Sequence, residues 1–268
     1  MEKQRLPIDT FKFHGIELVE DGKEAKGECP FCGKNKFSVD IESSKWVCFY
    51  CNGDGGNEYT FVRKLWEESF CGPYEKIAEE RGLLPETLES WGLRRSLITD
   101  EWLLPGYNCN GKIVQLYRYT AIGGDKPRFW ATPNLHHGVF GGHQYIPSKD
   151  VVFLCEGPWD GMKMQEVLMS SKQKGDKFVR IKRLGSGNMY EGANVLAVPG
   201  CNIFQTNWKE MFVGKKVYLA YDNDHPKPHP KTKKLMTPPG IAGMKRAASI
   251  LGNGTARTRC MKWGDRGE

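Results

Sequence analysis

The stretch VYLAYDND, residues 217–224, joins a strand suited to burial to two aspartates that lie one residue apart. The continuous run from Val217 to Tyr221 is typical of a strand covered on both faces of a sheet. A carboxylate at the edge of an apolar core is costly unless a cation, a proton or a hydrogen bond compensates it. Asp222 and Asp224 therefore predict a compensating partner at the end of this strand.

Similar segments surround this stretch in the last 118 residues and predict an α/β fold with a mostly parallel sheet. The segment VVFLCEGPWDGMKMQEVLM (151–169) indicates a strand, a turn at Glu156 and Gly157, and a helix that begins at Pro158. NVLAVPG (194–200) and RTRCMKWGD (257–265) indicate further strands, and GIAGMKRAASIL (240–251) indicates a helix.

Acidic residues follow two of these strands. Ligands of open α/β sheets bind beyond the carboxyl ends of the strands, where Glu156, Asp222 and Asp224 are expected to meet. Three converging carboxylates repel one another, so Mg²⁺ or Mn²⁺ is the natural compensation. Taken singly, Glu156 is also explained as a helix cap and each aspartate as a turn residue.

Four of the nine cysteines are regularly spaced in CPFCGKNKFSVDIESSKWVCFYC, residues 29–51. Cys29 and Cys32 form one C-x2-C pair, fifteen residues follow, and Cys48 and Cys51 form the second pair. This spacing suits a β-hairpin that brings four thiolates around one structural Zn²⁺ with no open coordination position. Two disulfides or a redox pair are the alternatives, and neither needs two identical pairs.

The residues between the cysteine pairs have two interpretations. Lys34, Lys36 and Lys45 with Phe37 and Trp46 would suit phosphate contacts and base stacking on single-stranded nucleic acid. Packing of Phe37 and Trp46 into the small core of the ribbon is the simpler reading of each residue. A helix is expected after the ribbon, capped by Asn57.

Composition and charge define the broad class. The chain has 268 residues and a formal net charge of +7, which fits a polyanionic partner without establishing one. No apolar run reaches membrane-spanning length and the first residues lack a signal-peptide pattern, so we expect a cytoplasmic protein without a membrane partner.

The middle of the chain predicts short strands around an Asn110-Gly111 turn. Gly106 to Lys112 spells G-x-x-x-x-G-K, but Ile113 stands where a P-loop needs Ser or Thr, and a hairpin replaces the required strand-loop-helix context. Arg118, Lys126 and Arg128 are close in sequence and serve equally as a solvated strand face or as anion ligands.

These motifs together resemble a known family. Glu156-Gly157-Pro158-Trp159-Asp160, Gly200, Asp222-Asn223-Asp224 and Gly243 resemble the toprim domain, and the cysteine ribbon with CFYCNGDGGNEYTFVRKL (48–65) resembles that of DnaG-type primases. The pairing of ribbon and toprim is most similar to the primase part of phage primase-helicases. The expected organisation is a zinc ribbon domain over 1–70, a linker over 71–81, a mixed α+β subdomain over 82–150, and a toprim domain over 151–268.

The resemblance implies synthesis of short RNA primers on a single-stranded DNA template from ribonucleoside triphosphates, in a bacterial or phage-infected cell and beside a replicative helicase. By matching position, Glu156, Asp222 and Asp224 would hold catalytic Mg²⁺ or Mn²⁺, and Asp160 would support them. Arg118, Lys126 and Arg128 would bind nucleotide phosphates, and the ribbon would read the template.

Departures from the family pattern leave alternatives. A basic segment (170–192) and a Pro/Lys-rich loop (225–240) interrupt the toprim region, and Asp265 is the residue left for a final acidic motif. A recombination mediator that binds DNA through a zinc site and a toprim would lack catalysis, but its two parts lie nearly adjacent. A toprim nuclease would need no ribbon, and a topoisomerase would need a tyrosine domain for which the chain has no room.

Overall fold

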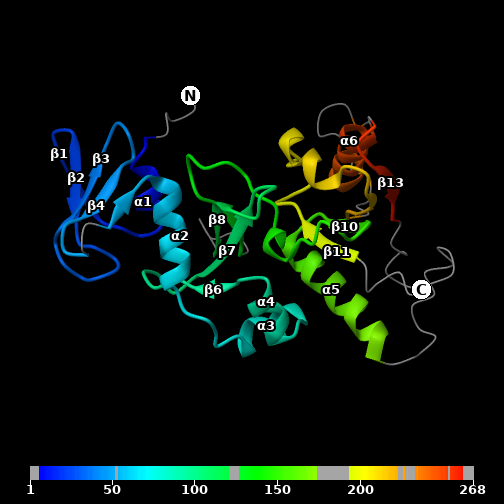
Figure 1. Cartoon of the computed structure of the whole chain (residues 1–268), viewed down its shortest axis with the longest axis horizontal. Helices are drawn as coiled ribbons and strands as arrows, with labels where there is room; N and C mark the ends of the chain where they lie inside the picture. Colours follow the sequence, from blue (N-terminus) through cyan, green and yellow to red (C-terminus); the bar gives the residue numbers. More distant parts are fainter. Residues whose placement is uncertain are drawn as a thin grey trace. The chain divides into compact units, whose positions relative to one another are not determined.

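The computed structural model describes residues 6–51, 54–120, 127–173, 193–222, 226, 228, 233, 235–252 and 254–261. The chain divides into two compact units. The ribbon unit comprises Met1–Glu75, Gly92–Gly106 and Ile113–Gly138, and the α/β unit comprises Lys76–Trp91, Tyr107–Lys112 and Val139–Glu268. Figure 1 labels most of their elements.

The ribbon unit begins with a short helix and a five-stranded antiparallel sheet. These elements are α1 (Asp9–Phe13), β1 (Leu18–Asp21), β2 (Glu24–Gly27), β3 (Phe37–Asp40), β4 (Trp46–Cys48) and β5 (Gly55–Gly56). The strands lie side by side in chain order, and β3 and β4 form the expected hairpin between the cysteine pairs. The hairpin pairs Phe37 with Cys48, which brings the second cysteine pair back towards the first.

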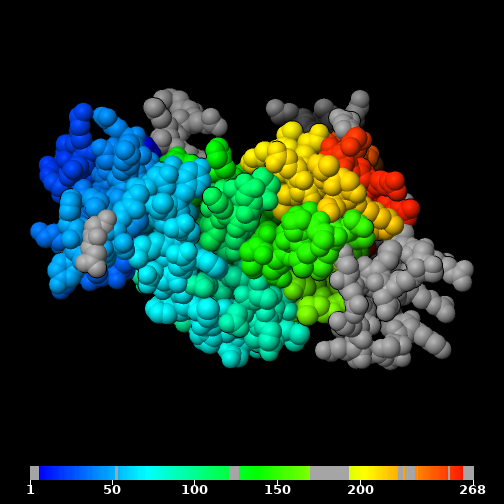
Figure 2. Space-filling model, viewed as in Figure 1, coloured from blue at the N-terminus to red at the C-terminus, as the bar shows by residue number. Residues whose placement is uncertain are grey.

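Helix α2 (Glu58–Glu68) follows the ribbon as the sequence predicts. The Asn57 side chain accepts a hydrogen bond from the Thr60 backbone N–H, which satisfies one unpaired donor of the first turn. Phe61, Val62 and Leu65 are buried on one face of α2. Figure 2 shows the atoms of the ribbon and of α2, in the blue shades, packed in continuous contact.

A second sheet of four strands belongs to the same unit. Its strands are β6 (Arg94–Arg95), β7 (Trp102–Tyr107), β8 (Ile113–Thr120) and β9 (Arg128–Ala131), in that order. Leu103 of β7 and Leu116 of β8 are fully buried in one core with Phe11 and Phe61. The ribbon and the second sheet therefore share a core. The boundaries of the zinc ribbon domain, the linker and the 82–150 subdomain stay predictions.

The α/β unit contains a parallel four-stranded sheet. Its elements are α3 (Glu75–Arg81), α4 (Pro85–Ser90), η1 (Gly142–Gln144), β10 (Val151–Cys155), α5 (Pro158–Gln173), β11 (Ala193–Ala197), η2 (Thr206–Phe212), β12 (Lys216–Ala220), α6 (Pro239–Gly252) and β13 (Arg257–Cys260). The strand order is β11-β10-β12-β13, and every neighbouring pair is parallel. The four strands and both long helices agree with the sequence prediction.

Both faces of the parallel sheet are buried. Leu154 and Leu219 face a core that contains Trp208 of η2 and Ala247 of α6. Phe153 and Tyr218 stack on the opposite face, and α5 contacts β10 and β11. Helices α5 and α6 therefore cover opposite faces (Figure 1). This double burial explains the continuous apolar strands, which show no alternation with polar residues.

The predicted fold class is confirmed: an α/β region with a parallel sheet and helices follows a small mixed region and a four-cysteine ribbon. Among the described residues, no helix combines the length and the apolar character that a membrane crossing needs.

Candidate functional site: a tetrathiolate ribbon and a strand-end acid cluster

The four ribbon cysteines converge as a metal site. Their sulfur atoms all lie within 4.8 Å of one another, and the Sγ–Sγ distances are 3.8 Å for Cys29–Cys51 and 3.7 Å for Cys32–Cys48. A tetrahedron with Zn–S bonds of about 2.3 Å has edges of about 3.8 Å, so the sulfurs already stand at zinc-binding spacing. None of the nine cysteines forms a disulfide, which argues against the disulfide alternative.

The backbone of the second cysteine pair favours the thiolate form. Burial acts to raise the pKa of Cys48, but hydrogen bonds from the backbone N–H groups of Tyr50 and Cys51 and from the thiols of Cys51 and Cys29 together lower it to about 7. Burial raises the pKa of Cys29 and of Cys51, so without a metal the cluster favours one thiolate, at Cys48. Zn²⁺ binds the thiolate, so these N–H groups prepare a ligand. Four protein ligands leave no position for substrate, which makes this site structural.

The aromatic residues of the ribbon separate into core and surface. Phe37 and Trp46 are 1% and 3% exposed and stack on each other, so the simpler reading of both residues holds. Phe49 and Tyr50 are instead 72% and 62% exposed, and Lys34 Nζ lies 5.4 Å from the centre of the Tyr50 ring. Sequence reasoning missed this pair. Their place between two metal ligands was the available signal, because a two-residue link between ligands cannot turn both side chains into the core.

The acid cluster lies at the carboxyl edge of the parallel sheet. Strands β10 and β12 are neighbours with Cys155 opposite Ala220, so Glu156 and Asp222 leave the sheet at the same edge. Glu156 Oε2 accepts a hydrogen bond of 3.1 Å from the Asp222 backbone N–H. The structure thus brings together the two acids that the sequence assigned to separate strand ends. Asp224 and Asp265 lie outside the described residues.

Asp160 adds a third carboxyl group, in the first turn of α5. Its side chain keeps contact with solvent, yet the surrounding protein raises its pKa to about 6, and the charge of Asp222 adds to the shift. Both burial and a neighbouring negative charge favour the neutral form of a carboxyl group. A Cβ on Gly157 would lie 3.0 Å from Asp160 Oδ2, so Gly157 leaves room for this carboxyl group.

The chemistry of this cluster fits a hard divalent cation. Within the described ranges Asp160 forms no ion pair, and the nearby charge of Asp222 adds to the effect of burial in raising its pKa. Carboxylate oxygens are the ligands that Mg²⁺ and Mn²⁺ prefer. In the described part of the chain only the cysteines converge within 4.8 Å, so the three acids form a looser group than the zinc ligands.

Two predicted nucleotide-binding residues lie on one face of β8 and β9 in the ribbon unit. Arg118 pairs with Trp130, and Thr120 pairs with Arg128, which places both arginines on the same face. Arg128 is exposed, and its guanidinium lies 3.9 Å from the centre of the Trp130 ring. Lys126 lies outside the described residues.

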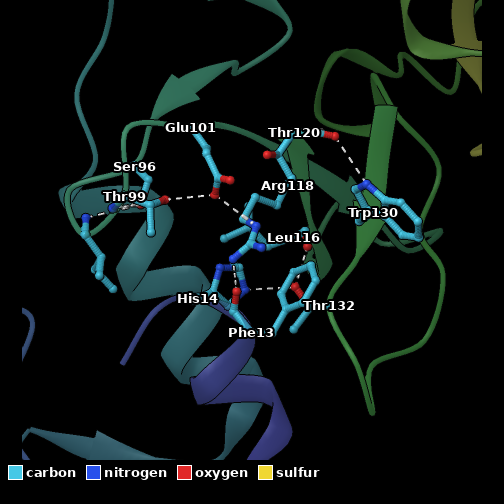
Figure 3. Close-up of polar contacts among 11 residues, drawn as sticks. Phe13, His14, Ser96, Thr99, Glu101, Leu116, Arg118, Thr120, Trp130 and Thr132 are labelled. Carbon is cyan, nitrogen blue, oxygen red and sulfur yellow. Dashed lines mark hydrogen bonds and ion pairs between the residues drawn. The ribbon is translucent and has the colours of Figure 1, made fainter. Parts of the chain in front are cut away.

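Arg118 is held by protein groups (Figure 3). Its Nε lies 2.9 Å from Glu101 Oε2 as an ion pair without hydrogen-bond geometry, and its Nη1 donates to the Phe13 carbonyl oxygen. The guanidinium also lies 4.4 Å from the centre of the Phe13 ring. Phe13 is 105 residues away in sequence, so no local pattern predicts these contacts.

Buried His14 completes this connection between α1 and the second sheet. Thr132 Oγ1 donates to the Leu116 carbonyl oxygen and lies 2.9 Å from His14 Nε2, so the hydroxyl must accept the Nε2 proton. Burial, followed by the charge of Arg118, lowers the pKa of His14 to about 3. The imidazole is therefore neutral, and Arg118 is the one cation of this local cluster.

Comparisons with known sequences identify the ribbon region. Residues 3–90 match the CHC2 zinc finger of DnaG. A DNA primase of Halalkalibacterium halodurans is 33% identical over 91 residues, which are 32% of this chain and 15% of that protein. A DNA primase of Synechocystis sp. is 32% identical over 89 residues, which are 32% of this chain and 14% of that protein. The matched segment therefore spans only about 15% of the length of these curated relatives.

One solved structure extends the likeness of the fold beyond the ribbon. The zinc-binding and RNA polymerase domains of the Aquifex aeolicus primase match 98% of this chain and 78% of that chain, with a TM-score of 0.52 and 15% identity. The primase fragment of the bacteriophage T7 primase-helicase protein covers 88% of both chains with a TM-score of 0.44 and 16% identity.

The chain thus combines a DnaG-type zinc ribbon with a fold similar to that of the RNA polymerase domain of the Aquifex aeolicus primase. The resemblance to DnaG-type primases that the sequence predicted is confirmed by the ribbon match and by the fold.

Proposed function

We propose that this chain is a DNA primase, which synthesises short RNA primers on a single-stranded DNA template by metal-dependent nucleotidyl transfer. The observation that carries the proposal is the meeting of Glu156 and Asp222 at adjacent strand ends, in a chain that begins with a DnaG-like zinc ribbon. A catalytic carboxylate cluster distinguishes an RNA polymerase fold that is active from one that only binds DNA.

We assign the site residues as follows. Glu156, Asp222 and Asp224 would hold Mg²⁺ or Mn²⁺, which when bound activates the attacking 3′-hydroxyl and neutralises charge on the leaving pyrophosphate. Asp160 supports these acids from the first turn of α5. Glu156 also accepts the proton of the attacking 3′-hydroxyl.

Nucleotide phosphates would contact the basic residues of the ribbon unit. Arg118, Lys126 and Arg128 carry this role in the proposal. Arg128 is better placed than Arg118, because the Arg128 side chain is exposed whereas the Arg118 side chain is only 16% exposed.

The ribbon would read the template. Bases stack on exposed aromatic rings at about 1–3 kcal/mol per base, and neighbouring lysines attract phosphates. The exposed Phe49 and Tyr50, with Lys34 over the Tyr50 ring, fit such a contact better than the buried Phe37 and Trp46. Ribonucleoside triphosphates and a replicative helicase, in the cytoplasm of a bacterial or phage-infected cell, complete the proposed setting.

Incubation with circular single-stranded DNA, four ribonucleotides and Mg²⁺ tests the proposal. A primase yields labelled oligoribonucleotides of discrete short lengths, and these disappear without template. A toprim nuclease would instead cut the DNA, and a recombination mediator would bind it and leave both substrates unchanged. Either of those results would contradict the primase assignment.

A further inference from the structure

Helix α6 begins against the acid cluster. Gly240 is the second residue of α6 and is buried. A Cβ on Gly240 would lie 2.3 Å from the Asp222 carbonyl oxygen and 2.9 Å from Glu156 Oε2. Contacts below 3.0 Å do not occur for real side chains, so only glycine lets α6 begin so close to both acids.

This close approach affects the position of Glu156. Its Oε2 atom lies between the Asp222 N–H, which donates to it, and the first turn of α6. The first turn of a helix carries partial positive charge on N–H groups that have no helical partner. One carboxylate oxygen therefore lies against two chain segments, and the partial positive charge at a helix start favours an acid in this place.

We propose that Gly240 is a positioning residue of the acid cluster, which holds Glu156 and Asp222 in the arrangement that binds a divalent cation. The inference rests on the proposed function in one respect, namely which reaction the bound cation serves. Cation binding can be measured without any reaction, so the two can fail separately.

Two other glycines of α6 provide matched controls. A Cβ on Gly243 would lie 2.1 Å from the Cys201 carbonyl oxygen, a clash as severe as that at Gly240 but against a loop that carries none of the acids. A Cβ on Gly252 would meet nothing within 4 Å. Gly240→Ala thus tests the position of the acids, Gly243→Ala tests loss of packing alone, and Gly252→Ala should change neither.

The experiment measures Mn²⁺ binding to the zinc-loaded chain by electron paramagnetic resonance, beside the Tm of each variant. We expect Gly240→Ala to weaken Mn²⁺ binding by about 10-fold or more, a usual effect of disturbing groups that orient metal ligands. Gly243→Ala should lower Tm and keep the Mn²⁺ affinity of the folded protein, and Gly252→Ala should match wild type. Excess Mn²⁺ should restore part of the activity of Gly240→Ala, which it cannot do for a folding defect.

Two results would overturn the proposal: wild-type Mn²⁺ affinity in Gly240→Ala, or an equal loss of affinity in Gly243→Ala. If Gly240→Ala does not fold, Pro239→Gly loosens the same turn without adding an atom near Glu156, and unchanged affinity there also overturns it. If wild-type protein binds Mn²⁺ through Glu156 but makes no primers, the primase assignment is contradicted and the role of Gly240 is not.

Discussion

At the scale of single residues, the surroundings of Asp160 change its pKa. Burial, with the charge of Asp222, raises its pKa to about 6. The folded protein therefore binds its proton more tightly than the unfolded chain does, where the pKa is about 3.9. The ionised Asp160 carboxylate therefore destabilises the folded protein fully above about pH 6, and this destabilisation disappears below about pH 4.

We therefore expect Asp160→Asn to raise the Tm at pH 8, without added Mg²⁺ or Mn²⁺, by about 1–2 °C, because contact with solvent screens part of the repulsion. The gain should shrink as the pH falls from 6 to 4. Thermal melts across this range provide the check, and a gain that is larger at pH 4 than at pH 8 would contradict the assignment.

Phe49 and Tyr50 give a second test at the residue scale. Replacing both with alanine should weaken single-stranded DNA binding by about 10-fold or more, as expected for the loss of one or two stacked bases. The Tm should change little, because both side chains are exposed. Phe70→Ala is the matched control, since Phe70 is 60% exposed in the same unit and is not part of the ribbon sheet. Equal DNA affinity in the double variant and the control would remove the stacking surface from the ribbon.

Some of these residues were predictable from sequence and others were not. The cysteine spacing predicted the tetrathiolate, because a regular local pattern is enough to place two ligand pairs on one hairpin. The partners of Arg118 depend on Phe13, and the role of Gly240 depends on the path of α6 back to Glu156. Such contacts between distant segments leave no local pattern in the sequence.

At the scale of elements, the register of β10 and β12 places the acids at one edge. Continuous apolar strands predicted a parallel sheet, and the strand ends predicted where carboxylates would meet. The sequence did not predict that α6 returns to the same edge. Asp222 and Gly240, which bracket the Pro/Lys-rich segment, lie against each other.

The Pro/Lys-rich segment contains four lysines, Lys227, Lys231, Lys233 and Lys234, of which the structure describes only Lys233. If they hold template phosphates, their replacement by alanine should weaken single-stranded DNA binding whatever the sequence. The slope of log affinity against log salt should then shrink by up to about 0.7 per lost contact. Initiation sites should not change, because the ribbon is proposed to select them. A titration with an unchanged slope would show that the loop makes no phosphate contact.

We predict the same phosphate-binding role for the basic segment 170–192. Its residues Lys174, Lys177, Arg180, Lys182 and Arg183 lie outside the described residues, and the side chain of Lys172 is not described, so its role stays a prediction.

At the scale of the whole molecule, the protein has two separate hydrophobic cores, so loss of zinc should destabilise one of them and leave the other intact. The ribbon shares its core with the second sheet through Leu103 and Leu116, whereas the parallel sheet has a core of its own. The domain boundaries at 70, 81 and 150 stay predictions, and this shared core is the reason to test them.

Cys48→Ser should release zinc, since a structural site depends on all four ligands. Hydrogen exchange should rise in the ribbon and also in β7 and β8, while β10 and β12 keep their protection. Elemental analysis should find one zinc per wild-type chain and less in the variant. Exchange confined to residues 6–68 would contradict the shared core, and undiminished zinc would contradict the site.

Primer synthesis by Glu156→Gln and Asp222→Asn protein, measured beside wild type, tests most directly whether the strand-end acids carry the proposed reaction. Both variants should retain or raise the Tm, because removing a like charge relieves repulsion. Wild type should make template-dependent short oligoribonucleotides with Mg²⁺, and both variants should make none above background. Wild-type yields from either folded variant would contradict the assignment of these carboxylates to catalysis.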